Sequence, residues 1–134
     1  MRFTYFRTVY LNDTDAAGVV YFASGMQICH EAYEESLRAA DIYLSDIVAK
    51  KEIAIPITHA EIDFFRPLFL GDRLKVELVT EQLTTSDFAI AYEIYSAANP
   101  DKIAVKARTK HIGINLHRKK IPLPEMLLQW IDNQ

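Results

Sequence analysis

Disulfide bonds, membrane-spanning runs and metal-binding histidine pairs are all missing from this 134-residue sequence. Its single cysteine, Cys29, cannot form a disulfide within the chain, and such a composition is typical of a reducing compartment. No stretch approaches the ~20 consecutive apolar residues that a membrane-spanning helix needs. The four histidines show neither HxH nor HxxxH spacing, so we expect no bound metal.

Charge and composition narrow the class of protein further. A formal net charge of -3 gives no reason to expect nucleic acid or a membrane surface as a partner. Half of the residues are hydrophobic and a quarter are charged, which is typical of a folded globular chain. The first seven residues alternate polar and apolar side chains and lack the continuous apolar core of a signal peptide. We therefore expect one cytoplasmic domain over residues 1–134.

The periodicity of apolar residues predicts a strand followed by a long helix. Alternation over residues 3–11 favours the strand, and loop-forming residues 12–18 end it. Apolar side chains then recur every three or four residues from Phe22 to Ala40, which predicts one helix of roughly five turns. Its solvent face is expected to carry Glu31, Glu34, Glu35 and Arg38.

A short helix around residues 44–51 and four long strands are expected next. Period-two alternation returns at Ile53 and continues to Leu116, with a change of parity near His59. Turns are predicted at residues 67–72 and 99–101, and a closing helix at 123–131. We expect an α+β fold in which an antiparallel sheet of about five strands wraps around the long helix. The other sheet face would be covered by self-association.

Two carboxylates, Asp13 and Asp15, stand in the loop before the long helix. Free N–H groups and the helix dipole favour negative charge at this place, so one interpretation is a helix cap or an Asx turn. The other interpretation is catalytic, since a carboxylate can attack a carbonyl, or direct water at it, while helix amides hold the carbonyl oxygen. Gly18 would let a substrate approach the backbone closely. The spacing leaves both interpretations open.

The run LNDTDAAGVVYF, from Leu11 to Phe22, resembles the signature loop of the 4-hydroxybenzoyl-CoA thioesterase family of hotdog-fold proteins. The similarity continues through residues 30–38, 57–67 and 71–74, and so extends over nearly the whole chain. The resemblance implies the hotdog fold and hydrolysis of a small-molecule acyl-CoA thioester. It also implies that no cofactor is needed, because coenzyme A is part of the substrate.

Position in that family suggests roles for four residues of the loop. Asp15 corresponds to the nucleophile or general base, and the backbone amide of Phe22 to the group that polarises the thioester carbonyl. Asp13 corresponds to a position that holds the loop through bonds to nearby amides. Tyr21 either packs under the loop or contacts the substrate.

His30 stands where many relatives carry an acid near the hydroxyl of an aromatic acyl group, across a subunit interface. It either hydrogen-bonds a phenolic oxygen or is a partly exposed helix residue. Residues 30–34 and 59–65 most resemble the branch of 1,4-dihydroxy-2-naphthoyl-CoA thioesterases of phylloquinone synthesis. His59 is either a buried, hydrogen-bonded histidine or part of the acyl pocket.

The groups that bind the phosphates of coenzyme A are harder to assign. Some aryl-CoA relatives have a basic run after the third strand, but residues 82–87 here are QLTTSD. Arg118 and Lys119, in the basic run 117–120, are substitutes, as are Arg66 and Arg73, although such a run is also typical of a solvated turn.

The family resemblance further implies a homo-oligomer, a dimer of dimers with active sites between subunits. Three alternatives remain for the function: a general short- or medium-chain acyl-CoA thioesterase, a non-catalytic acyl-CoA-binding module and a hotdog dehydratase. Dehydratases of this fold carry a catalytic His or Asp pairing on the helix and a characteristic glycine pattern. Neither is evident in this sequence.

Overall fold

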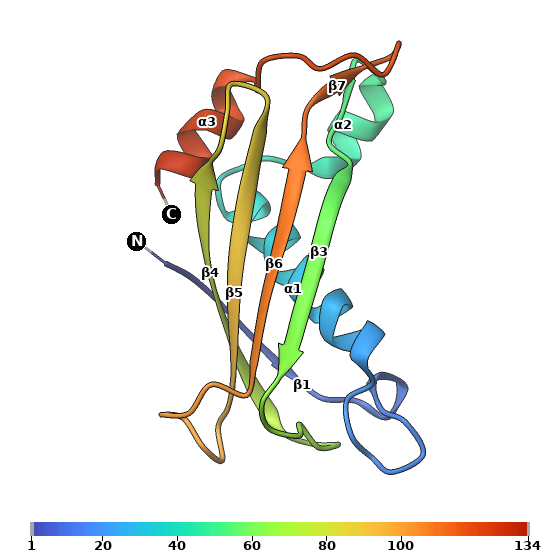
Figure 1. Ribbon diagram of the computed structural model, residues 1–134, viewed down its shortest axis with the longest axis vertical. Coiled ribbons are helices and arrows are strands. Elements are labelled where there is room, and N and C mark those ends of the chain that lie inside the picture. The colour runs from blue at the N-terminus through green and yellow to red at the C-terminus, as the bar shows by residue number, and fades with distance from the viewer. Residues whose placement is uncertain (1, 134) are drawn as a thin grey trace.

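The computed structural model describes residues 2–133 and is built on a five-stranded antiparallel sheet (Figure 1). The strand order is β1–β4–β5–β6–β3, so β1 and β3 form the two edges. The bounds of these strands are β1 Phe3–Thr8, β3 Ile57–Phe64, β4 Arg73–Gln82, β5 Asp87–Ser96 and β6 Val105–Ile112. A small antiparallel pair joins β2 (Ile53–Ala54) to β7 (Ile114–Asn115) beyond one end of the sheet.

The long helix α1 (Phe22–Ala39) crosses the inner face of the sheet (Figure 1). Its buried residues recur at helical spacing and are Gly25, Ile28, Cys29, Ala32, Tyr33, Ser36 and Leu37. A Cβ atom at Gly25 would lie 2.8 Å from Cζ of Phe64, so the missing side chain lets α1 lie close to β3. The core therefore sits between this helix and the sheet.

Two shorter helices complete the fold. Helix α2 (Leu44–Lys50) lies near the small sheet, and α3 (Glu125–Asp132) packs beside β4 (Figure 1). The indole Nε1–H of Trp130 donates to Oγ of Ser36 at 2.7 Å, and the Thr80 hydroxyl donates to the carbonyl of Ile131 at 2.9 Å. These bonds satisfy polar groups buried under α3 and fix it to α1 and β4. Within residues 2–133, no helix is long and apolar enough to cross a bilayer.

The predicted α+β order of elements is confirmed, including the change of parity near His59. There the register of β3 against β6 shifts between Ile57 and His59, so side chains on either side of the shift alternate differently. The predicted extent of the first strand is wrong at its end. The strand stops at Thr8, and Leu11 is 71% exposed in a 3-10 turn, η1 (Leu11–Asp13).

Three further details differ from the periodicity. The last long strand is interrupted at Gly113, which divides it into β6 and β7. Phe22 and Ala40, at the two ends of the helical pattern, are exposed. Glu31 faces β1 rather than solvent, where it binds Arg7.

Candidate active site

The loop between β1 and α1 is fixed by backbone hydrogen bonds. Asp15 N–H donates to the carbonyl of Val19 at 2.9 Å, which closes the loop, and Val20 N–H donates to the carbonyl of Leu68 at 2.8 Å. Gly18 lies at the tip with a φ of 78°, in the left-handed region that favours glycine. The loop is therefore held in one conformation and anchored to the turn that precedes β4.

Asp13 anchors the start of this loop. Its carboxylate is buried and accepts bonds from the guanidinium of Arg7 and from the N–H of Tyr10 at 2.8 Å. Arg7 also donates to both oxygens of Glu31 on α1, at 2.7 and 3.1 Å. Burial alone would raise the pKa of Asp13, but the bonds from Arg7 and Tyr10 hold that pKa below its usual value. One arginine thus joins β1, the loop and α1, and Asp13 has the holding role expected for it.

Asp15, by contrast, is exposed. Its Oδ1 accepts hydrogen bonds from Ala17 N–H at 2.9 Å and from Val19 N–H at 3.3 Å, the pattern of an Asx turn. Its other oxygen, Oδ2, has no hydrogen-bond partner among residues 2–133. The loop therefore orients this carboxylate by one oxygen and leaves the other accessible.

The N-terminus of α1 lies at the end of the same loop. Phe22 is the first helical residue, and the preceding Tyr21 is extended and makes no side-chain capping bond. The first turn holds no acidic residue, and among residues 2–133 the Phe22 N–H has no acceptor. Free N–H groups and the positive end of the helix dipole together favour a negatively charged oxygen. Such a place can hold the oxygen of a reacting carbonyl.

A hollow of about 330 Å³ opens beside this helix start. Its lining is Val19, Val20, Phe22, Phe64, Phe65, Arg66, Pro67 and Leu68. Tyr21 is 48% exposed, and its ring centroid lies 4.7 Å from that of Phe22, so the expectation that Tyr21 packs under the loop is wrong. The hollow is mainly apolar and has one cation, Arg66, at its border.

His30 lies two helical turns further along α1, between two more hollows. One, of about 300 Å³, is lined by Met26, Gln27, His30, Ile57, Tyr92 and Thr109. The other, of about 600 Å³, extends from His30 and Tyr33 to α2, β2 and Leu116. The His30 ring meets the edge of Tyr33 at 5.4 Å between centroids, and its Nδ1 lies 3.8 Å from Oε1 of Glu34. His30 is a half-exposed helix residue that borders both spaces.

Comparison with known proteins shows the family of this chain. The profile of the family described as the thioesterase-like superfamily matches residues 9–131. The chain belongs to this thioesterase superfamily. A 1,4-dihydroxy-2-naphthoyl-CoA hydrolase of Rippkaea orientalis is 52% identical over 128 residues, which are 95% of this chain and 93% of that protein. Its counterpart in Crocosphaera subtropica is 49% identical over 129 residues, 96% and 94% of the two chains.

A solved structure extends the comparison to three dimensions. The crystal structure of a 1,4-dihydroxy-2-naphthoyl-CoA thioesterase from Synechocystis superposes with a TM-score of 0.95 at 44% identity. The match covers 99% of this chain and 97% of that one. The hotdog fold and the thioesterase resemblance predicted from the sequence are therefore confirmed.

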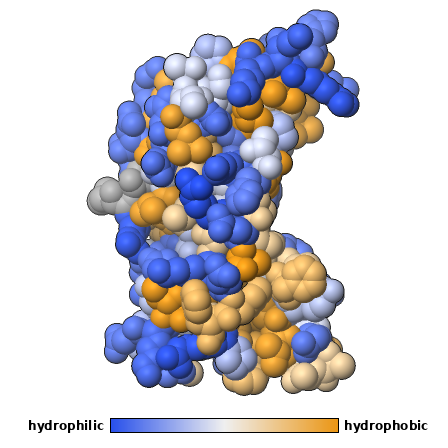
Figure 2. Space-filling view, in the orientation of Figure 1, coloured by the Kyte–Doolittle hydropathy of each residue, from blue (hydrophilic) through white to orange (hydrophobic). Residues whose placement is uncertain are grey.

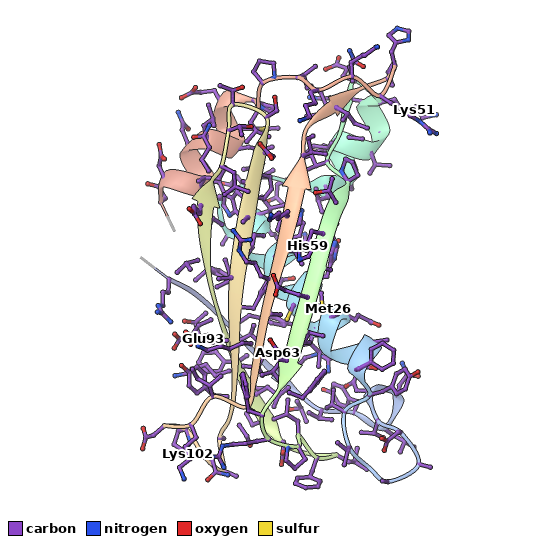
Figure 3. All side chains as sticks on the ribbon, viewed as in Figure 1. Met26, Lys51, His59, Asp63, Glu93 and Lys102 are labelled. Atoms are coloured by element: carbon purple, nitrogen blue, oxygen red, sulfur yellow. The ribbon has the colours of Figure 1, made fainter. Side chains whose placement is uncertain are left out.

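One predicted site residue of this thioesterase, His59, lies outside the hollows described above. It is exposed on the edge strand β3 (Figure 3), and its Nε2 lies 3.2 Å from Oε1 of Glu61. Of the two interpretations of His59, the buried one is wrong, because no strand among residues 2–133 lies beyond β3. A role of His59 in substrate binding stays a prediction.

Arg118 and Lys119 belong to the turn that follows β7, and β7 lies at the opposite end of the molecule from the loop that precedes α1 (Figure 1). The side chain of Asn115 orders their turn by accepting from the N–H groups of His117 at 2.9 Å and Lys119 at 3.0 Å. Both basic side chains are exposed. A single chain therefore does not bring them to Asp15, and their part in binding coenzyme A stays a prediction.

Two groups of polar residues that are buried or partly buried escaped the reasoning from sequence. The first group is the clamp, in which Arg7 binds both Asp13 and Glu31. It could have been inferred, because Arg7 falls on the same face of its strand as Tyr5 and Val9. Likewise, His111 has the inward parity of Val105 in β6. In both cases a polar residue stands at a strand position where apolar residues alternate, and such a residue often belongs to a buried hydrogen-bond network. Within residues 2–133 the structure contains no cluster of three or more metal-ligating side chains.

Proposed function

We propose that this chain hydrolyses 1,4-dihydroxy-2-naphthoyl-CoA to 1,4-dihydroxy-2-naphthoate and coenzyme A. One observation carries the mechanism: an accessible carboxylate, that of Asp15, is oriented by a loop that leads directly into an uncapped helix start at Phe22. Relatives about 50% identical over almost the whole chain are named as hydrolases of this thioester, which supports the choice of acyl group.

In the proposed reaction, the Phe22 N–H donates to the thioester oxygen and stabilises the negative charge that develops there. Asp15 either attacks the carbonyl carbon, forming an anhydride that water then opens, or takes a proton from water as the water attacks. The carbon–sulfur bond breaks in both cases, and the sulfur leaves as coenzyme A and gains a proton. The residues do this chemistry themselves, so the proposal includes no cofactor.

We further propose that the working unit is a homo-oligomer. In it, two copies of the chain pair through their β3 strands to form each dimer. β3 pairs with β6 on one side only, and no strand among residues 2–133 pairs with its outer edge. Seven of its eight residues are exposed, all except Ile62. Exposed apolar residues flank it at both ends of the molecule (Figure 2). At the loop end they include Tyr21, Phe22, Phe64 and Phe65, and at the other end Val48 and Leu116.

A two-fold axis through the middle of β3 would pair two copies antiparallel and reverse their ends. The basic turn at residues 117–120 of one copy would then approach the Asp15 loop of the other. In this arrangement Arg118 and Lys119 of one copy would lie near the phosphates of a coenzyme A bound at the Asp15 loop of the other copy. Light scattering is expected to give a dimer or a dimer of dimers, whereas a fully active monomer at assay concentration would contradict the shared site.

The acyl group is tested by release of free thiol from four thioesters: 1,4-dihydroxy-2-naphthoyl-CoA, 2-naphthoyl-CoA, octanoyl-CoA and acetyl-CoA. We expect the dihydroxynaphthoyl thioester to have by far the largest kcat/KM, because a site built around polar groups discriminates against substrates that lack their partners. Preference for the aliphatic thioesters would support a general acyl-CoA thioesterase instead. Binding without thiol release would support a non-catalytic module. The phylloquinone pathway and the cytoplasmic location stay predictions from the sequence.

A further inference from the structure

Three polar side chains form a continuous chain on the inner face of the sheet, beneath α1. The Tyr92 hydroxyl lies 3.2 Å from Oγ1 of Thr109, and that same Oγ1 lies 2.8 Å from Nε2 of His111. Their exposed fractions are 1%, 3% and 0%. Well-packed apolar residues of similar shape would give comparable stability at these positions. A polar chain in the core therefore calls for an explanation beyond stability.

His111 determines the direction in which this chain donates hydrogen bonds. It stacks on Phe88 with 4.7 Å between centroids, and Tyr33 lies at the same centroid distance. Burial, with a smaller effect of His30, lowers the pKa of His111 to about 4, so the ring is neutral at pH 7 and carries one proton. Its Nδ1 is buried and has no hydrogen-bond partner among residues 2–133.

Two proton orders are chemically consistent with these contacts. If the proton were on Nδ1, a buried N–H donor would lack an acceptor, and unpaired buried N–H groups are rare in proteins. If it is on Nε2, His111 donates to Thr109 and the Thr109 hydroxyl donates to the oxygen of Tyr92. The Tyr92 O–H is then the free end of the chain. It has no other acceptor among residues 2–133.

Tyr92 and Thr109 both line the hollow of about 300 Å³ that Met26, Gln27 and His30 border from α1. This volume falls at the lower end of the usual range for small-molecule sites. Figure 3 shows Met26 at the place where α1 passes behind β3. The bordering helix residues follow Phe22 by four to eight positions, or ~6–12 Å along the axis at the rise of an α-helix. An aryl group whose carbonyl lies at the Phe22 N–H would have to extend over this distance along α1 to enter the hollow.

We propose that the Tyr92–Thr109–His111 chain is a specificity-determining site for a ring oxygen of the aryl acyl group, with Tyr92 as the donor that contacts it. The proposal rests on the proposed function. The ring oxygen concerned is the hydroxyl remote from the thioester, since the chain lies deep in the hollow, away from the helix start. An acyl group without that oxygen would leave the Tyr92 donor unpaired.

Two substitutions test this site directly. Tyr92→Phe removes the donor and keeps the ring, and Thr109→Val breaks the chain with little change of shape. Each should reduce kcat/KM on 1,4-dihydroxy-2-naphthoyl-CoA by about 10-fold, the usual effect of one hydrogen bond. On 2-naphthoyl-CoA, which lacks both hydroxyls, the change should stay within about 2-fold. Thr109→Ser keeps the hydroxyl and should restore the discrimination between the two substrates.

Thr80→Val is the matched control. Thr80 is also a sheet threonine with a hydrogen-bonded hydroxyl, but it bonds the carbonyl of Ile131 and does not line the hollow. It should leave the ratio of the two kcat/KM values unchanged. Equal losses on both substrates in the Tyr92 and Thr109 variants, or no loss on either, would overturn the proposal and assign the chain a structural role.

A binding measurement separates this proposal from the proposed function. If wild-type protein failed to hydrolyse either naphthoyl thioester, the proposed function would fail. The affinities of the free acids 1,4-dihydroxy-2-naphthoate and 2-naphthoate would still report on the site, because binding does not require catalysis. The proposal predicts about 10-fold tighter binding of the hydroxylated acid to wild type, and loss of this preference in Tyr92→Phe and Thr109→Val. Equal affinities for wild type would overturn it.

Discussion

Asp13 and Asp15 lie two residues apart in one loop, but their carboxylates have opposite surroundings. Asp13 is buried against Arg7 and anchors the loop, whereas Asp15 is exposed and bonds only to backbone N–H groups of its own loop. The pair shows that position in a motif does not by itself assign a role. The carboxylate of Asp13 holds the loop, and the open carboxylate of Asp15 is the one to which we assign the chemistry.

His111 and His30 repeat this contrast inside the fold. His111 is buried among aromatic rings with a lowered pKa, while His30 borders two hollows on α1. In each pair one member is buried among its neighbours, whereas the other is accessible and is the member to which we assign contact with the substrate. Changing both members of each pair therefore tests whether this division of roles is real.

The largest expected effect comes from Asp15→Asn. The amide oxygen of asparagine still accepts from Ala17 N–H and Val19 N–H, so the loop and the fold should remain intact. Turnover should fall by about 10³-fold or more, because an amide is neither a nucleophile nor a base. Thiol release measures kcat, and thermal unfolding checks the fold. A kcat near that of wild type would remove Asp15 from the mechanism.

Asp13→Asn should give the reverse result, a loss of stability larger than its direct effect on chemistry. Removing one partner of a buried ion pair leaves the other charge uncompensated, at a cost of about 3 to 5 kcal/mol. Here the Arg7 guanidinium would keep Glu31 as its carboxylate partner, so the lower end of that range is expected. Urea unfolding measures the free energy. Unchanged stability in this variant would mean that the clamp does not hold the loop.

The pH dependence of stability tests the buried histidine. The folded-state pKa of His111, about 4, lies below the ordinary value of 6.5, so protonation favours the unfolded chain. Its contribution to stability is complete above pH 6.5 and is lost as pH falls from 6.5 to 4, by up to roughly 3 kcal/mol. Asp13, whose pKa is also lowered, loses its contribution only below its ordinary value of 3.8.

Urea unfolding at a series of pH values separates the two groups. His111→Gln should lose much of the dependence between pH 6.5 and 4, whereas His30→Gln, the same change at an exposed helix site, should retain it. A wild-type curve that is flat across this range would show that His111 does not stay neutral in the folded protein.

Periodicity in the sequence predicted the elements well because burial imposes it along most of the chain. It placed α1 to within a residue at each end and found the parity change that proved to be a register shift in β3. It failed at Leu11, where the chain leaves the sheet, because an apolar side chain in an exposed turn contributes to the same alternation as one in the core.

The candidate site was predicted less completely than the fold. The loop match identified Asp15 and the helix start at Phe22, whose geometry is local to the chain. For His59 a buried position was one of two interpretations, but the strand order that puts β3 at an edge depends on pairing between distant segments. The Tyr92–Thr109–His111 chain joins neighbouring strands, and no single segment of sequence reveals it.

The smallest expected effect concerns His30. His30→Ala should cost about 1–3 kcal/mol in kcat/KM on 1,4-dihydroxy-2-naphthoyl-CoA, from the loss of one hydrogen bond to a ring hydroxyl. On 2-naphthoyl-CoA it should cost much less, because no such bond exists there to be lost. Steady-state kinetics on both thioesters give the two costs. Glu34→Gln, which alters the nearest carboxylate to His30 Nδ1, tests whether that neighbour orients the ring. Equal costs on both substrates would assign His30 to packing, and the accessible histidine would then differ from Asp15 in having no part in the chemistry.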